Sequence, residues 1–174
     1  MDSFGYDFVT MSPDIDEKAI RIENPYELPS LIADAKRMAL VEKISEPAIL
    51  ITADQVVVCD NQLYEKPVTE EDVKNAFVKY SAGYPAETVS ALVVTNTETG
   101  NYYGGLDIAK VYFKPVPAEV VEEFIKTGVP FTNAGSFDHA HDLISPYIDR
   151  IEGDNDSVMG LPIKLLKELI AKVS

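Results

Sequence analysis

Apolar and polar residues follow two periods along the chain, one typical of strands and the other of helices. Runs rich in β-branched residues, in part alternating with polar ones, predict strands at 4–11, 48–59, 62–64, 86–97 and 102–114. Apolar residues at three- and four-residue spacing predict helices at 25–43, 69–83, 117–128 and 163–173. Because helices and strands alternate, the pattern predicts an α/β fold.

Signals at the ends of these segments agree with the periodicity. Thr69 precedes Asp72 by three residues, the spacing of a capping box, and Gly83 and Gly128 stand where two helices should stop. The turn at 98–101 joins two predicted strands into an antiparallel hairpin. Since one long hairpin occurs within an otherwise alternating pattern, the sheet is expected to be mixed.

The chain has 174 residues and shows neither an internal repeat nor a dividing linker, so one domain spanning 1–174 is expected.

Its 29 acidic and 15 basic residues give a net charge of −14, which argues against binding a nucleic acid polymer or an anionic membrane. A small phosphate ligand is compatible with this charge if a few lysines converge. Without a long apolar stretch or a secretory pattern, the chain is expected to be soluble and cytoplasmic.

Cys59 is the single cysteine of the chain, so neither an internal disulfide nor a thiolate metal cage can form. It ends an apolar run, which favours a buried structural thiol over a nucleophile. The candidates for chemistry are therefore carboxylates, lysines and histidines.

The most informative position is Asp54, because it interrupts a strand that is otherwise apolar. Desolvating a carboxylate is costly unless a metal, a cation or several hydrogen-bond donors compensate for the lost water. One interpretation is an aspartate at the end of the sheet that caps a nearby helix. The other is a metal ligand or general base at the edge of the sheet where ligands bind.

Two lysines lie near this strand in the sequence. Lys36 belongs to the preceding predicted helix, and Lys66 follows the strand in Glu65-Lys66-Pro67. Either lysine alone is typical of a solvated surface charge. Together with Asp54 and the acidic segment 14–17, they alternate carboxylates with ammonium groups, the combination that a metal-bound polyphosphate requires. The sequence contains neither a Gly-Lys-Thr loop nor a Gly-x-Gly-x-x-Gly motif.

His139 and His141 form a His-x-His pair in a segment without clear periodicity. On a strand both imidazoles would face the same way and could bind zinc or copper, which would make the protein a metal-binding module. A polar loop whose histidines face solvent or hydrogen-bond locally is the favoured interpretation, because the sequence offers no obvious third ligand.

A series of short motifs follows in order along nearly the whole chain. They are Gly5-Tyr6-Asp7-Phe8, Asp14-Ile15-Asp16-Glu17, Ala33 to Lys36, Thr52 to Val58, Glu65-Lys66-Pro67, Tyr80 to Gly83, Asn133-Ala134-Gly135, Ile151 to Asp154 and Ser157 to Pro162. In this ordered set the chain resembles the Maf-like family of nucleoside triphosphate pyrophosphatases, and it is most similar to the eukaryotic, plant-type branch. The resemblance implies a fold related to the inosine triphosphate pyrophosphatases, with a mixed sheet flanked by helices and two lobes around a cleft.

The resemblance also implies an activity, a cofactor and a set of site residues. The family hydrolyses a nucleoside triphosphate to its monophosphate and pyrophosphate with a divalent cation, Mg²⁺ or Mn²⁺, and homodimers are expected in it. Glu17 and Asp54 match its acidic active-site positions and would hold the metal, with Asp54 taking the proton of the attacking water. Lys36 and Lys66 match its phosphate-contacting lysines.

The chain departs from the family pattern in two places. The family's amino-terminal strand and its Ser-x-Ser-x-Arg-Arg loop have no counterpart in the sequence, so the domain is expected to be N-terminally truncated relative to the family. The alternative function is a catalytically impaired fragment that binds a nucleotide or a protein partner. Phe137-Asp138-His139-Ala140 stands where members that prefer pyrimidines carry Tyr-Gly-Ile-Gln, which leaves the base open and makes His139 a candidate substrate-binding residue.

Overall fold

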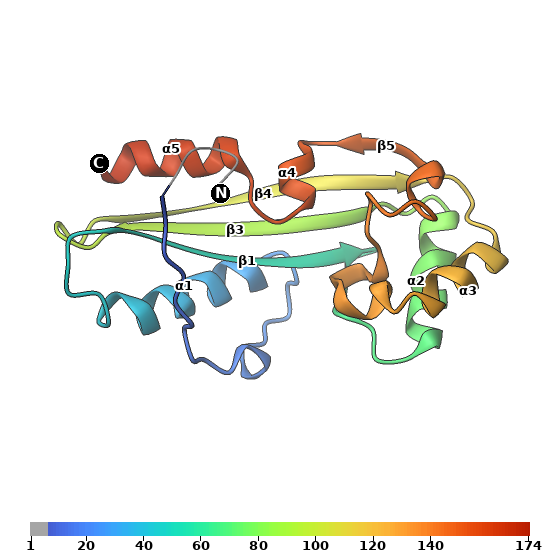
Figure 1. Cartoon of the computed structure of the whole chain (residues 1–174), viewed down its shortest axis with the longest axis horizontal. Coiled ribbons are helices and arrows are strands. Elements are labelled where there is room, and N and C mark those ends of the chain that lie inside the picture. The colour runs from blue at the N-terminus through green and yellow to red at the C-terminus, as the bar shows by residue number, and fades with distance from the viewer. Residues whose placement is uncertain (1–6) are drawn as a thin grey trace.

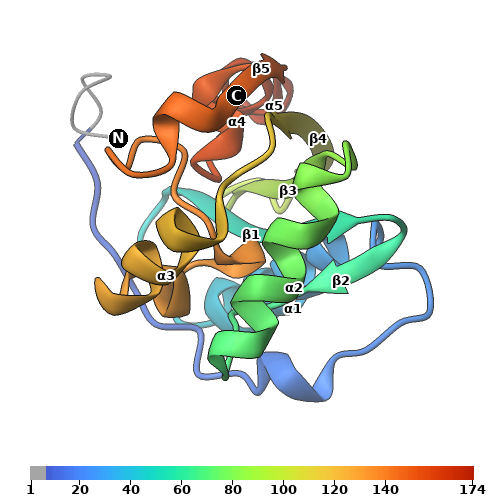
Figure 2. The same ribbon diagram turned by 90° about the vertical axis from the view of Figure 1, so that its right-hand side faces the viewer.

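Residues 7–174 are described by a computed structural model, and their five strands form one sheet in the order β2-β1-β3-β4-β5 (Figures 1 and 2). The strands are β1 (Ile49–Cys59), β2 (Gln62–Tyr64), β3 (Ala86–Asn96), β4 (Tyr102–Phe113) and β5 (Ile148–Glu152). Each neighbouring pair is antiparallel. The expected α/β architecture is confirmed, but the expected mixture of parallel and antiparallel pairs is not found among the described strands.

The antiparallel pairing follows from where the connecting helices lie. α2 (Glu70–Ser81) and α3 (Ala118–Lys126) pack together at the end of the sheet where β1 and β4 finish (Figures 1 and 2). Neither helix carries the chain back along a face of the sheet. The next long strand therefore begins near the end at which the previous one stops, and it runs in the opposite direction.

Two further helices cover the two faces of the sheet. α1 (Leu28–Val41) lies against β1 and β3, and α5 (Ile163–Val173) lies against β3 and β4 on the other face (Figure 1). Among residues 7–174, no helix is long and apolar enough to cross a membrane. The remaining helical segments are short: η2 (Glu17–Ala19), η3 (Val129–Thr132), η4 (Ala134–Ser136), η5 (Ser145–Tyr147) and α4 (Asn155–Val158).

Local signals located the helix boundaries better than they located the first strand. Thr69 Oγ1 accepts a hydrogen bond from Asp72 N while the Asp72 carboxylate accepts one from Thr69 N, so the predicted capping box begins α2. By contrast, residues 7–11 form no strand, and Val9 is 91% exposed. Residues 4–6 of that predicted strand lie outside the described residues. Alternation of polar and apolar residues does not produce a strand unless another strand is available to pair with it.

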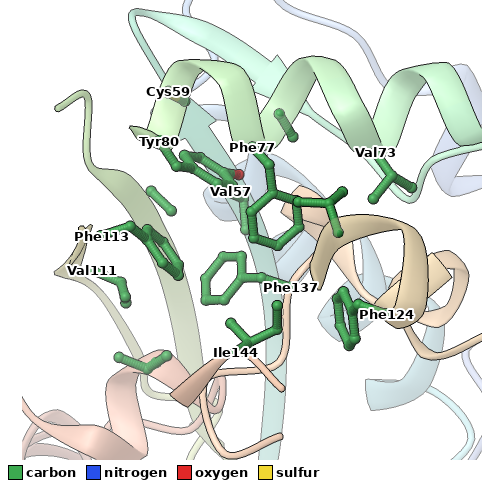
Figure 3. Packing of buried hydrophobic residues seen from close by; sticks show 14 of the residues in the cluster. Val57, Cys59, Val73, Phe77, Tyr80, Val111, Phe113, Phe124, Phe137 and Ile144 are labelled. Atoms are coloured by element: carbon green, nitrogen blue, oxygen red, sulfur yellow. The ribbon is translucent and has the colours of Figure 1, made fainter. Parts of the chain in front are cut away.

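The largest hydrophobic cluster lies where α2 and α3 meet the ends of β1 and β4, and aromatic rings dominate it (Figure 3). Tyr80 stacks on Phe113 with ring centroids 5.1 Å apart, and the Phe137 ring meets both in T-shaped contacts. The buried Tyr80 hydroxyl donates a hydrogen bond to the Gly135 carbonyl oxygen at 2.8 Å. This cluster fixes η4 and, through it, the loop that follows Phe137.

We expect Gly135→Ala to lower the free energy of unfolding by about 2–4 kcal/mol, combining left-handed backbone strain with overpacking. The φ angle of Gly135 is 71°, and a Cβ atom there would lie 2.7 Å from Val57 Cγ1. Gly128→Ala is the matched control, because φ is 76° but no atom lies within 4 Å of the added carbon. Its expected cost is about 1 kcal/mol, from backbone strain alone. Urea denaturation followed by circular dichroism measures both, and equal losses would contradict the steric argument.

Candidate active site

Asp54 lies in the middle of β1, on the face of the sheet that α1 covers. Alternation along the strand turns Asp54 and Val56 toward α1, while Gln55 and Val57 point to the opposite face. Lys36 Nζ, from α1, donates a hydrogen bond to Asp54 Oδ1 at 2.9 Å. The side chains of Lys36 and Asp54 are only 16% and 11% exposed, so they form a largely buried ion pair.

The Lys36 ammonium group brings a second carboxylate into the same place. It forms an ion pair with Glu17 Oε1 at 3.1 Å and donates a hydrogen bond to the Ala53 carbonyl oxygen, also at 3.1 Å. Glu17 opens η2, and Asp16 caps that turn by accepting hydrogen bonds from Lys18 N and Ala19 N. The structure thus brings together Glu17, Lys36 and Asp54, as the sequence predicted.

The site lies at an open edge of the sheet, where the Ala53 carbonyl oxygen accepts its hydrogen bond from Lys36. β1 pairs with β3 along nearly its whole length, but on its other side it pairs with β2 only at Val57–Cys59. The remainder of that edge has no neighbouring strand in the described part of the chain. Within residues 7–174 the Asp54 carboxylate accepts no hydrogen bond from a backbone N–H, so the interpretation of Asp54 as a helix cap is wrong.

Burial and charge act against each other in this cluster. Burial raises the pKa of Asp54 above its ordinary value, and the hydrogen bond and positive charge of Lys36 only partly offset that effect. Burial alone would lower the pKa of Lys36, but its hydrogen bonds to Asp54 and Glu17 and their charges outweigh burial and raise it. The lysine therefore stays protonated near neutral pH, and the aspartate is a stronger proton acceptor than an exposed one.

A hollow of about 400 Å³, which we call the α1-side hollow, opens beside this cluster. Lys66 lines it, as the sequence predicted. Its other charged lining residues are Glu17, Lys18, Arg21, Asp54 and Glu65. Sequence reasoning missed Arg21, whose Nη2 forms an ion pair with Glu65 Oε1 at 3.2 Å across 44 positions of the chain. The arginine follows Glu17 by four residues, but nothing local shows that it turns toward the β2–α2 loop.

His139 lies in a different hollow, which we call the α4-side hollow, with a volume of about 300 Å³. Gln55 lines both hollows, because it follows Asp54 on β1 at the open edge. Its Nε2 donates hydrogen bonds to Ser90 Oγ and to the Ser157 carbonyl oxygen, both at 2.9 Å, and so ties α4 to the sheet. The other lining residues are Val57, Thr88, Asn133, Ala134, Phe137, Asp138, Ala140, Val158 and Met159.

The His-x-His pair does not act together. His141 Nδ1 accepts a hydrogen bond from Leu143 N at 3.2 Å, and its ring meets Phe124 with centroids 4.9 Å apart. The local interpretation is therefore confirmed for His141. Within residues 7–174 no group of three or more His, Cys, Asp or Glu side chains is arranged to hold a metal, so a metal module centred on the pair finds no support.

Cys59 is also accounted for by packing. Its side chain is buried at the end of β1, and burial raises the pKa of its thiol to about 11. A thiol that ionises so reluctantly is a poor nucleophile at neutral pH. The interpretation of Cys59 as a buried structural residue is confirmed.

Glu17 and Asp54 are the side chains that could hold a divalent cation, since both carboxylates converge on the point that the Lys36 ammonium contacts. Mg²⁺ is commonly held by one or two carboxylates, with water and substrate phosphates completing its coordination. Two converging carboxylates in a hollow with room for phosphates fit that requirement. What fits Mg²⁺ is the chemical type of the two ligands, which are carboxylates.

Comparison with known proteins gives a consistent result over nearly the whole chain. A family profile described as Maf-like protein matches residues 1–173. The chain is 40% identical to a 7-methyl-GTP pyrophosphatase of Dictyostelium discoideum, over 98% of this chain and 88% of the relative. It is 30% identical to a dTTP/UTP pyrophosphatase of Vibrio parahaemolyticus, over 95% of this chain and 86% of the relative. With its ordered motifs now placed on one fold, the chain belongs to the Maf-like family.

Proposed function

We propose that this protein is a nucleoside triphosphate pyrophosphatase, which hydrolyses a triphosphate to the nucleoside monophosphate and pyrophosphate. The observation that carries this proposal is that Glu17 and Asp54, which meet at the Lys36 ammonium group, line one hollow together with Lys66. The names of the relatives in Dictyostelium and Vibrio support the same activity. The net charge of −14 suits a small ligand held by a few cations better than a polyanion.

The proposal includes a divalent cation, Mg²⁺ or Mn²⁺, held by Glu17 and Asp54. Bound there, such a cation would supply Lewis-acid stabilisation of charge on the phosphate oxygens. The support is that two carboxylates, the ligands that these cations prefer, line the same hollow.

The side chains of this protein then act on the proton and the leaving group. A water oxygen attacks the α-phosphorus, the bond from that phosphorus to the bridging oxygen breaks, and Asp54 accepts the proton of the water. Lys36 and Lys66 offset the negative charge that develops on the departing pyrophosphate. Arg21 adds a guanidinium group that can contact two phosphate oxygens at once.

The nucleoside end of the substrate belongs, in this proposal, in the α4-side hollow beside His139. Gln55 lines both hollows, so a single ligand can pass the open edge of β1 and occupy both. A further small hollow is lined by Lys66 and by Ser136, the residue before Phe137. Lys66 thus lies in one hollow with a residue three positions before His139.

The cytoplasm is the proposed location of this activity. Cys59 is a free thiol in a chain with no second cysteine, as is usual for proteins of reducing compartments. The charge of the chain gives no basis for attachment to an anionic membrane surface.

We expect Asp54→Asn to lower kcat/KM for pyrophosphate release by at least about 100-fold, because the amide keeps the volume but accepts no proton. The assay measures pyrophosphate released from a panel of triphosphates with Mg²⁺ or Mn²⁺, and chelation by EDTA is expected to abolish it. Asp142→Asn is the control, since Asp142 is exposed and lines neither hollow. Parental rates in Asp54→Asn would overturn the site assignment, and a folded parent that binds nucleotides without releasing pyrophosphate would favour the impaired-fragment alternative.

Arg21→Ala is expected to lower kcat/KM by about ten- to a hundredfold, because a charge-assisted hydrogen bond to phosphate is worth about 1.5–3 kcal/mol. Arg150→Ala is a matched control, because Arg150 is 52% exposed, Arg21 is 48% exposed, and each forms an ion pair with a carboxylate. Steady-state kinetics of both variants make the comparison. Equal effects would show that Arg21 contributes only general surface charge.

The proposal also includes a homodimer formed through the open β4 face, defined by Tyr102, Leu106 and Ile108. Strand register places these exposed side chains on the same side of the sheet as α1, which packs mainly on β1 and β3. The charges beside the face are paired, Arg37 with Asp34 and Lys110 with Glu87. Two copies of a chain with a net charge of −14 can therefore approach there without strong local repulsion.

Sedimentation velocity is expected to give twice the mass of one chain for the parent and a shift toward monomer for Leu106→Glu, because a carboxylate at the centre of an apolar interface is not paired. Val78→Glu is the control, since Val78 is an exposed apolar residue on α2. A monomeric parent, or dissociation caused only by the control substitution, would contradict this interface.

A further inference from the structure

The small hollow that Lys66 and Ser136 line, which we call the α2-side hollow, has a volume of about 240 Å³. It shares four lining residues with the α1-side hollow: Leu63, Glu65, Lys66 and Val68. The other residues that line it are Tyr64, Pro67, Asp72, Asn75 and Ser136. Within residues 7–174, Glu65 is paired with Arg21, whereas Lys66 takes part in no ion pair. One cation thus belongs to both hollows and is not committed to a carboxylate of the protein.

Ser136 has an unusual backbone conformation in this hollow. It is only 2% exposed, and its φ angle of 63° lies in the left-handed region that residues other than glycine seldom adopt. Gly135 before it is left-handed as well, and Phe137 after it is anchored in the aromatic cluster (Figure 3). The loop thus keeps a serine in a strained conformation beside the phosphate-binding lysine, and strain of this kind clusters at functional sites.

The Ser136 hydroxyl has no hydrogen-bond partner within residues 7–174. The backbone N–H of Ser136 donates to the Asn133 carbonyl oxygen at 3.2 Å, but no group of the described chain pairs with Oγ. Thr95 Oγ1 is the one side-chain polar atom of the same residues that is both sealed from solvent and unpartnered. Ser136 Oγ therefore keeps some access, which the α2-side hollow provides. A buried hydroxyl that the protein leaves unpaired is expected to find its partner in a ligand.

Both carboxylates of the α2-side hollow are already engaged. Glu65 Oε1 pairs with Arg21 Nη2 at 3.2 Å. Asp72 Oδ2 accepts hydrogen bonds from Val68 N and Thr69 N at the start of α2. The side chains left without a polar partner within residues 7–174 carry a cation, two hydroxyls and an amide: Lys66, Tyr64, Ser136 and Asn75. All of these groups can donate hydrogen bonds, so the hollow favours a ligand that is rich in acceptors.

We propose that the α2-side hollow binds the terminal phosphate of the triphosphate, and that the Ser136 hydroxyl donates a hydrogen bond to one of its oxygens. This inference rests on the proposed function, because it takes the α-phosphate to lie beside Asp54 in the α1-side hollow. A phosphate chain that extends from there past Lys66 enters the α2-side hollow, since Lys66 lines both. Phosphate oxygens are charged acceptors, as the free donors of this hollow require.

The proposed site makes Ser136 a reader of the phosphate chain and not of the base. The outer phosphate of the departing pyrophosphate contacts it, whereas the nucleoside monophosphate lies in the α1-side and α4-side hollows. The two products of the reaction are therefore expected to depend on Ser136 to different extents.

The test measures inhibition by each product, pyrophosphate and the nucleoside monophosphate, with a triphosphate that the parent hydrolyses. Ser136→Ala is expected to raise the inhibition constant of pyrophosphate about ten- to a hundredfold, because a hydrogen bond to a charged group is lost. The constant of the monophosphate is expected to stay unchanged. Asn75→Ala is expected to act in the same direction as Ser136→Ala, and Asn75 is exposed on α2, so its truncation leaves the core intact.

Ser145→Ala is the control, because Ser145 is exposed and lines none of the three hollows. Alanine keeps the Cβ atom of Ser136, so the substitution at 136 removes the hydroxyl alone. Urea denaturation reports whether each variant is folded. If Ser136→Ala does not fold, Asn75→Ala decides by the same comparison of the two products.

Each outcome decides one of the two proposals. An unchanged constant for pyrophosphate in Ser136→Ala, an equal rise for both products, or a rise for the monophosphate alone would overturn the terminal-phosphate site. If the parent releases no pyrophosphate from any triphosphate, the proposed function fails. Isothermal titration with magnesium pyrophosphate then still tests the phosphate site, since binding that Ser136→Ala and Asn75→Ala weaken would support it, and absent or unaltered binding would end it.

Discussion

The buried ion pair of Lys36 and Asp54 is the constraint on which the rest of this site depends. A carboxylate in the middle of an apolar strand must meet a compensating charge, and here the charge comes from α1. That requirement fixes where the helix lies, because α1 must pack on β1 closely enough for one lysine side chain to reach the open edge. Leu28 and Ile32 provide this packing by joining Val56, Val58 and Val89 in a cluster of their own. The acidic turn at Glu17 is then drawn to the same ammonium group.

A single strand divides the chemistry of the site between two faces. Asp54 turns toward α1 and the α1-side hollow, whereas Gln55 turns toward α4 and the α4-side hollow. Gln55 lines both hollows, and β2 pairs only with Val57–Cys59 of the β1 edge beside it. A longer β2 would protect the backbone groups of that edge, but it would separate the phosphates of a bound nucleotide from its base. The short hairpin is thus a requirement of the proposed function.

Short-range sequence signals predicted the structural features that depend on neighbouring residues. The capping box at Thr69 and the hairpin between β3 and β4 depend on neighbouring residues, and both were read from the sequence. Asp54 could be predicted as a site residue, because burying a carboxylate in an apolar strand costs desolvation free energy in any fold. Arg21 was missed as a residue that lines the α1-side hollow, since it meets Glu65 across 44 positions of the chain. The direction of the strands could not be predicted, because periodicity does not say whether a helix covers a face or packs at the end of a sheet.

The negative net charge of the whole chain affects whether such a site binds a small phosphate ligand or a polyanion. A net charge of −14 repels polyanions at long range, so attraction to phosphate must come from the few cations that line the α1-side hollow and, in the proposed function, from a divalent cation. Such attraction acts within a few ångströms, and it favours a compact triphosphate over a polymer whose remaining phosphates would face acidic surface.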